Sequence, residues 1–144
     1  MRAVILVVLA ALVFRAEARI GETEEQCVVR YGKVIERKHS EKPAAEVCLF
    51  ETGRFRIWAS FLKGHVAALQ ITTPDNAPFS EDELQVIMKA NAEGATWREV
   101  GGAPSQTREF RRSDDGATMY VVKGEALLIE SVEWKAATEG MSKF

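Results

Sequence analysis

The stretch FRIWASFLKGHVAALQIT, residues 55–72, decides the fold because it predicts the hairpin around which the other elements are arranged. Apolar residues alternate on both sides of Lys63-Gly64, the pattern of two half-buried β-strands joined by a tight turn. A three-residue loop with a left-handed glycine would pair Ile57 with Leu69 and gather the apolar side chains on one face. A two-residue loop would place Gln70 beside Ile57, so the hydrophobic pattern favours the longer loop.

The other face of this hairpin carries the predicted binding residues. In the expected register, Arg54, Arg56 and Trp58 point away from the core. Tryptophan and arginine are enriched at the energetic centres of interfaces, so these three residues form a candidate binding face of the sheet. The alternative is that a loop, or the segment 136–144, covers Trp58.

Two capped helices each precede a series of predicted strands. Thr23 with Gln26, and Ser80 with Glu83, place Gln or Glu three residues after a hydroxyl residue, which is the capping-box pattern. The first helix is short, and the second is expected from Glu81 to about residue 92. Turn residues after each helix divide the chain into three predicted strands, at residues 47–50, 55–61 and 65–72 in the first half and 107–112, 117–122 and 126–132 in the second.

This repeated order predicts the architecture. The helix caps are 57 residues apart and the two Lys-Gly turns are 60 apart, a near-constant offset that indicates internal duplication. We expect an α+β fold of two tandem αβββ units, with both helices packed on one face of antiparallel sheet. Repeat one covers about 19–73, repeat two about 74–135, and 136–144 is a polar C-terminal tail. The register of the second hairpin stays open, with Met119, Val121, Leu127 and Ile129 as its inward candidates.

Residues 1–18 have the pattern of a cleavable signal peptide. Arg2 precedes twelve uncharged residues, and Ala16-Glu17-Ala18 puts small residues three and one before a cut at Arg19. Twelve residues span about 18 Å as a helix, less than the roughly 30 Å of a hydrocarbon core. No cysteine follows the cut to accept a lipid. We therefore expect a secreted or periplasmic protein with no stable membrane insertion after cleavage; the alternative is an uncleaved N-terminus.

Charge and cysteine content narrow the function classes. Without the signal, 126 residues remain, enough for a single α+β domain at 19–135, with 17 basic and 20 acidic residues. The two signs are interleaved, which disfavours nucleic acid as a partner. The charged run 37–42 is expected to be a solvated loop. Export would allow a disulfide between Cys27 and Cys48, and the alternative is two buried thiols.

No catalytic or cofactor-binding signature stands out. His39 lies in the charged run and His65 beside a turn, neither with an evident catalytic partner. The cysteine and histidine spacings match no zinc site, and Asp114-Asp115-Gly116 is interpreted as a turn. We expect a non-catalytic binding or structural protein without cofactor or metal. Its partner is unknown, and the candidate class is an envelope or extracellular protein. The alternatives are a carrier of a small apolar ligand and a small secreted hydrolase.

Two resemblances accompany these expectations. The run GETEEQCVVRYG, residues 21–32, resembles the signature G-x-T-x-x-Q-[apolar]-x-x-x-[apolar]-G at the first helix of BamE/SmpA-like envelope proteins. Members of that family are usually lipoproteins with one unit and often have a proline soon after the helix, where this chain has Lys33-Val34. A helix followed by a meander, doubled in one chain, is similar to the secreted beta-lactamase inhibitor proteins, a family that binds its target with an open sheet face. The chain is also similar to small exported bacterial proteins that remain uncharacterised.

Overall fold

A computed structural model describes residues 19–101 and 106–139, so the predicted signal peptide and residues 140–144 of the predicted tail lie outside the described residues. The described chain forms three helices and one eight-stranded sheet. The helices are α1 (Glu24–Tyr31), α2 (Glu81–Ala90) and α3 (Val132–Glu139), and the strands are β1 (Glu36–Glu41), β2 (Ala44–Thr52), β3 (Phe55–Leu62), β4 (His65–Thr72), β5 (Trp97–Gly101), β6 (Thr107–Arg112), β7 (Ala117–Val122) and β8 (Ala126–Ser131).

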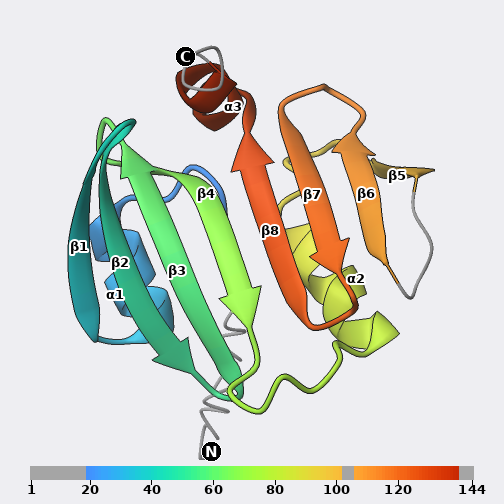
Figure 1. Ribbon diagram of the computed structural model, residues 1–144, viewed down its shortest axis with the longest axis horizontal. Coiled ribbons are helices and arrows are strands. Elements are labelled where there is room, and N and C mark those ends of the chain that lie inside the picture. Colours follow the sequence, from blue (N-terminus) through green and yellow to red (C-terminus); the bar gives the residue numbers. More distant parts are fainter. Residues whose placement is uncertain (1–18, 102–105, 140–144) are drawn as a thin grey trace, which may run out of the picture.

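The sheet is arranged around a central pair of strands, β4 and β8. Its order is β1-β2-β3-β4-β8-β7-β6-β5, and all neighbours are antiparallel. Each half of the chain supplies four consecutive strands, and the last strand of one half pairs with the last strand of the other. Figure 1 shows α1 and α2 behind the sheet and α3 beyond the upper end of β8.

The predicted architecture of two tandem αβββ units is wrong. The structure has two further strands, β1 and β5, joins all eight strands in one sheet, and adds a third helix. Most side chains of these two edge strands are exposed, so neither strand shows the alternation that would reveal it in the sequence. The charged run 37–42, expected to be a loop, therefore supplies most of an edge strand. Charged side chains at a sheet edge hinder pairing with other chains.

Both predicted helix starts are confirmed. The Thr23 hydroxyl accepts a hydrogen bond from the backbone N–H of Gln26 at 3.3 Å, and the Gln26 side chain accepts one from the Thr23 N–H at 2.9 Å. Ser80 and Glu83 form the same reciprocal pair at 3.1 and 2.9 Å. These bonds satisfy N–H groups that have no partner within the helix.

The hairpin between β3 and β4 has a tighter turn than expected. Lys63-Gly64 forms a two-residue turn, and both residues have positive φ, at 51° and 81°. The register then shifts at a β-bulge that leaves Ala67 without a paired residue. Ile57 consequently pairs with Ile71, and the predicted pairing of Ile57 with Leu69 is wrong. The bulge restores the alternation, so the apolar side chains still share one face despite the short loop.

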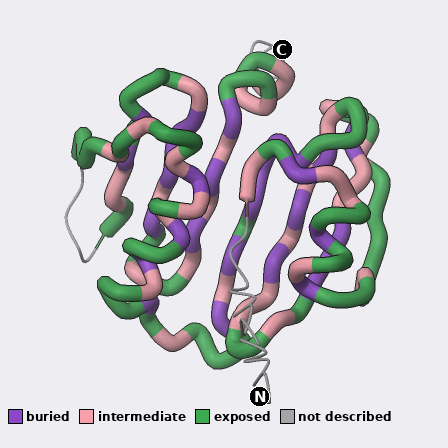
Figure 2. The backbone as a smooth tube through the Cα atoms, turned by 180° about the vertical axis from the view of Figure 1, so that it is seen from behind, coloured by how far each residue is buried: buried purple, intermediate pink, exposed green. Residues whose placement is uncertain are grey.

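The hydrophobic core lies between the sheet and the helices α1 and α2. Figure 2 shows exposed segments on the outer side of these helices and buried segments along the strands beneath them. The inward residues expected in the second hairpin are confirmed, because Met119, Val121, Leu127 and Ile129 are at most 1% exposed. None of the helices in the described chain combines the length and apolar character that crossing a membrane requires.

Both cysteines belong to this core. Cys27 and Cys48 are fully buried and are present as free thiols. The structure therefore shows the thiol form of the pair, and the disulfide stays a prediction. Burial, with a smaller contribution from Glu22, raises the pKa of the Cys27 thiol to about 12.

Candidate functional site

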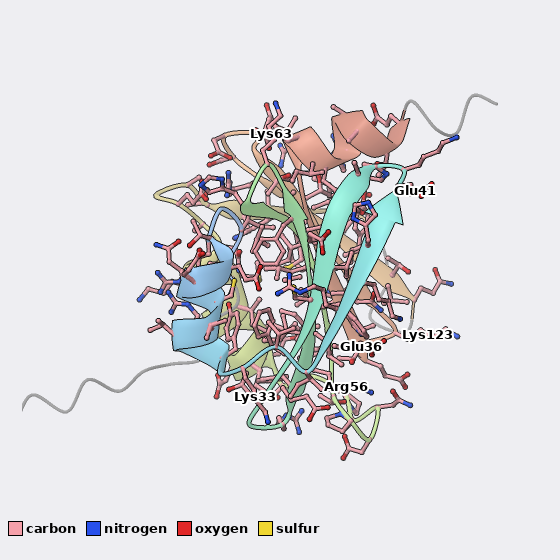
Figure 3. All side chains as sticks on the ribbon, turned by 90° about the vertical axis from the view of Figure 1, so that its left-hand side faces the viewer. Lys33, Glu36, Glu41, Arg56, Lys63 and Lys123 are labelled. Carbon is pink, nitrogen blue, oxygen red and sulfur yellow. The ribbon has the colours of Figure 1, made fainter. Side chains whose placement is uncertain are left out.

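The sheet face opposite α1 and α2 is the candidate functional surface. Figure 3 shows α1 on one side of the sheet and α3 at its upper end. Side chains of paired residues point to the same side, so they form rows across the strands. One outward row runs through Trp58, Gln70, Leu128 and Tyr120, and the neighbouring row runs through Ser60, Ala68, Glu130 and Thr118.

A hollow of about 410 Å³ opens on this face, with Trp58 and Trp134 in its lining. Ser60 and Ala68 face each other on β3 and β4, and their small side chains leave space among larger neighbours. The volume lies within the range of about 300–1,000 Å³ typical of ligand pockets. Further lining side chains are Lys38, Gln70, Leu128 and Glu130.

Helix α3 positions Trp134 beside the sheet. The Ser131 hydroxyl accepts a hydrogen bond from the Trp134 N–H at 3.1 Å and so caps the helix. The Lys135 Nζ donates to the Thr118 Oγ1 at 2.7 Å and lies 5.8 Å from the centroid of the Tyr120 ring. These contacts hold α3 against β7. Residues 136–139 of the predicted tail belong to this helix, and Trp58 stays partly exposed among the described residues.

The three predicted binding residues do not act as one group. Trp58 lines the hollow. Arg56 points to the same face but lies toward the end of the sheet away from α3 (Figure 3), with its Nε 3.4 Å from the Glu51 carboxylate. Arg54 is turned toward α2, where its Nε donates to the Glu83 carboxylate at 2.8 Å. Arg54 precedes the first residue of β3, so strand alternation does not determine its direction.

Several polar side chains in the hollow have no hydrogen-bond partner within the described part of the chain. They are the indole N–H groups of Trp58 and Trp134, the Ser60 hydroxyl, the Gln70 amide and the Glu130 carboxylate. The third tryptophan differs, because its Nε1 donates to the Met88 carbonyl at 2.8 Å. The unpaired groups of the hollow are therefore available to a ligand.

Lys38 partly covers Trp58. Its Nζ lies 4.7 Å from the centroid of the indole ring and 3.6 Å from the Glu36 carboxylate, and its side chain is 60% exposed. Exposed cation–π and ion-pair contacts of this kind each contribute about 1 kcal/mol or less. Lys38 can therefore move aside at low cost and uncover the ring.

A second hollow of about 300 Å³ contains His65, Glu93, Arg112 and Glu133. The His65 Nδ1 lies 3.2 Å from the Lys63 carbonyl oxygen, which can only accept, so this ring nitrogen carries the proton. Within the described residues, no hydrogen bond or ion pair joins His65 to either carboxylate. The other histidine, on β1, lies with its Nδ1 2.8 Å from a Glu46 carboxylate oxygen.

Metal ligands are not clustered in the described parts of the chain. In residues 19–101 and 106–139, no group of three or more histidine, cysteine, aspartate or glutamate side chains could hold a metal ion. The buried Arg112 is engaged by the Asp114 carboxylate at 2.7 Å and the Asn91 carbonyl at 3.0 Å. The second hollow thus has a buried cation that the chain itself already neutralises.

Sequence reasoning missed Leu128, Glu130 and Trp134. The first two reach the hollow through the pairing of β8 with β4, which joins residues more than fifty positions apart. Trp134 reaches it through α3, which begins at a lone serine cap without the Gln or Glu of a capping box. The one signal available was the alternation of the second hairpin, whose register the sequence left open.

Comparisons with known proteins bear on the fold. No protein-family model matches the chain, and no curated protein sequence matches it. Among solved structures, the chain is similar to a cysteine-rich secretory protein from Staphylococcus aureus, with a TM-score of 0.53 and 7% sequence identity. The match covers 81% of this chain and 46% of that one, so this chain spans less than half of that protein. At this identity the likeness concerns the fold alone, and the resemblance to BamE/SmpA-like proteins stays a prediction.

Proposed function

We propose that the protein is a non-catalytic binding protein that holds its ligand in the hollow with Trp58 and Trp134, on the open face of the sheet. The proposal includes export to the cell envelope or the extracellular space. The observation that carries it is the gathering of two partly exposed tryptophans and several unpartnered polar groups in one hollow. Ligand sites typically combine a concave shape, apolar walls and a few convergent polar groups.

The construction of the hollow also supports binding. Its floor lies on β3, β4 and β8, which are paired side by side. Its end wall on α3 is fixed through the contacts of Lys135 with Thr118 and Tyr120. A site held by regular elements loses little freedom when a ligand enters, which favours affinity.

The core gives little support to the alternative of an apolar carrier. Such a ligand would lie between the helices and the sheet. That layer is filled by large side chains with at most 1% exposure, among them Phe50, Ile57, Leu69 and Met119. Side chains buried to this degree are typically close-packed, so a guest in this layer would have to displace some of them.

A capture experiment tests the proposed function. The purified protein is immobilised and exposed to envelope extract and culture fluid from its own cells. We expect Trp58→Ala and Trp134→Ala to lose most of the captured material, because each removes a wall of the hollow. Arg54→Ala is the matched control, since its side chain contacts α2, and it should capture as much as the wild type. Equal capture by the wild type and both tryptophan variants would rule the proposal out.

A small hydrolase built around His65 is the second candidate function. The observation that favours it is the hollow that places this histidine near Glu93 and Glu133. It ranks below binding because no hydrogen bond or ion pair within the described residues joins His65 to a nucleophile or an orienting carboxylate. Hydrolysis of p-nitrophenyl acetate by the wild type, abolished in His65→Ala, would support this candidate. Equal rates for both proteins would exclude it.

A further inference from the structure

We infer that the ligand of the hollow is a saccharide, an inference that rests on the proposed function. A sugar ring has an apolar face of C–H groups and a rim of hydroxyls that both donate and accept hydrogen bonds. The hollow offers the complement of both parts. Its apolar surface comes from Trp58, Trp134 and Leu128, and its polar groups include donors and acceptors.

The hydrogen-bonding groups favour a ligand rich in hydroxyls. Ser60 and Gln70 can each donate and accept, Glu130 accepts, and the two indole N–H groups donate. An apolar anchor from a protein partner would bury these groups without partners, which costs about 1–3 kcal/mol for each neutral group. Hydroxyls satisfy donors and acceptors alike, and can do so without a fixed direction of the hydroxyl hydrogen.

The charges of the hollow favour a neutral ligand. The backbone positions of Lys38 and Glu130 lie in the same row of the sheet, four strand spacings or about 19 Å apart at 4.8 Å per strand, but the Lys38 side chain reaches over Trp58 on β3. The two residues contribute one positive and one negative charge to the hollow. Lys135, on the wall formed by α3, is engaged by Thr118 and the Tyr120 ring. Neither a strongly anionic nor a strongly cationic ligand is matched by this arrangement.

The outward row of the sheet continues beyond the hollow in a direction that suits a chain of sugars. Tyr120 follows Leu128 in the same outward row and is partly exposed, with the Lys135 Nζ 5.8 Å from its ring centroid. An oligosaccharide leaving the hollow toward β7 would therefore meet a third aromatic side chain. We expect longer saccharides to bind more tightly than disaccharides because they reach this ring.

Selective destruction of the captured material tests the inference separately from the proposed function. Extracts are treated with periodate, which cleaves vicinal diols of sugars, or with a protease, before exposure to the immobilised protein. A saccharide ligand predicts at least a tenfold loss of Trp58-dependent capture after periodate and little loss after protease. The opposite pattern would overturn the saccharide inference and leave the proposed function standing. Capture that is the same for the wild type and both tryptophan variants would overturn both.

A direct titration identifies where the sugar binds. The three tryptophans give three indole N–H signals in a proton–nitrogen NMR spectrum, assigned with single Trp→Phe variants. Cellobiose, maltose, N,N′-diacetylchitobiose and longer oligomers of each serve as probes, with sorbitol as the control for a polyol without a ring. We expect saturable shifts of Trp58 and Trp134 with at least one sugar, and no shift of Trp97. Equal shifts with sorbitol, or shifts that include Trp97, would contradict the inference.

Discussion

Replacing Gly116 with alanine tests the packing around a buried cation. This glycine lies in the turn between β6 and β7, and a Cβ atom added there would be 2.2 Å from the Arg112 Nη2. The two atoms cannot approach so closely, so the guanidinium must move. Arg112 is only 5% exposed and is held by the Asp114 carboxylate, the Asn91 carbonyl and, at 3.4 Å, the Glu93 carboxylate.

The expected cost follows from the bonds that this movement breaks. Displacing the guanidinium by about 1 Å removes at least one hydrogen bond of a charged group, worth about 1.5–3 kcal/mol. The ion pair with Glu93 adds little, because that carboxylate is 52% exposed. Alanine also lowers the conformational entropy of the unfolded chain, which stabilises the folded state by about 0.4–1 kcal/mol. We therefore expect Gly116→Ala to lower the free energy of unfolding by about 1–2 kcal/mol.

Urea unfolding followed by tryptophan fluorescence measures this change. Gly101→Ala is the matched control, because a Cβ atom there meets nothing within 4 Å among the described residues, and it should stay within about 0.5 kcal/mol of the wild type. In an Arg112→Ala background, Gly116→Ala should lose most of its effect, since the two residues are coupled through one contact. A cost that is the same in both backgrounds would refute the reasoning.

Three further predictions concern ionisable groups. Arg54→Ala should lower the free energy of unfolding by at most about 1 kcal/mol in urea titrations, because its ion pair with Glu83 is partly exposed; a larger loss would show a deeper structural role. Because burial raises the pKa of the Cys27 thiol to about 12, dithionitrobenzoate at pH 8 should label this thiol only after unfolding, and rapid labelling of the native protein would contradict this. The free energy of unfolding should also fall as the pH rises from about 9 toward 12, because this thiol loses its proton at a lower pH in the unfolded chain. The Arg112 guanidinium and the Gly116 N–H lower the pKa of the Asp114 carboxyl. The free energy of unfolding should therefore decline as the pH falls below 3.8, the ordinary pKa of an aspartate, and Asp114→Asn should reduce that decline. An acid titration of stability that is the same in this variant would exclude the contribution.

Local signals in the sequence identified the elements that local interactions stabilise. Thr23 and Ser80 were recognisable as helix caps because each bonds to a residue three positions away. The strands of the first hairpin were recognisable from their alternation. Its register was not, because the bulge at Ala67 changes the pairing without changing which side chains are apolar.

Elements without a hydrophobic signal of their own, or with distant partners, escaped prediction. β1 is a strand because β2 pairs with it, although its own residues are all polar and nearly all exposed. The candidate hollow needs both the pairing of β4 with β8 and the docking of α3. The alternation of β3 predicted Trp58 on the outer face, but it could not predict that Glu130 and Trp134 lie beside it.

The central strand pair also has a consequence for folding. β4 is complete at Thr72, but its partner β8 begins only at Ala126 and is the last strand of the described residues. High contact order of this kind slows folding, because a long loop must close before the pair can form. Until then β4 is an unpaired edge, a template for aggregation. A chain shortened before residue 126 would keep that edge, so nascent or truncated molecules should depend on protection that the finished protein does not need.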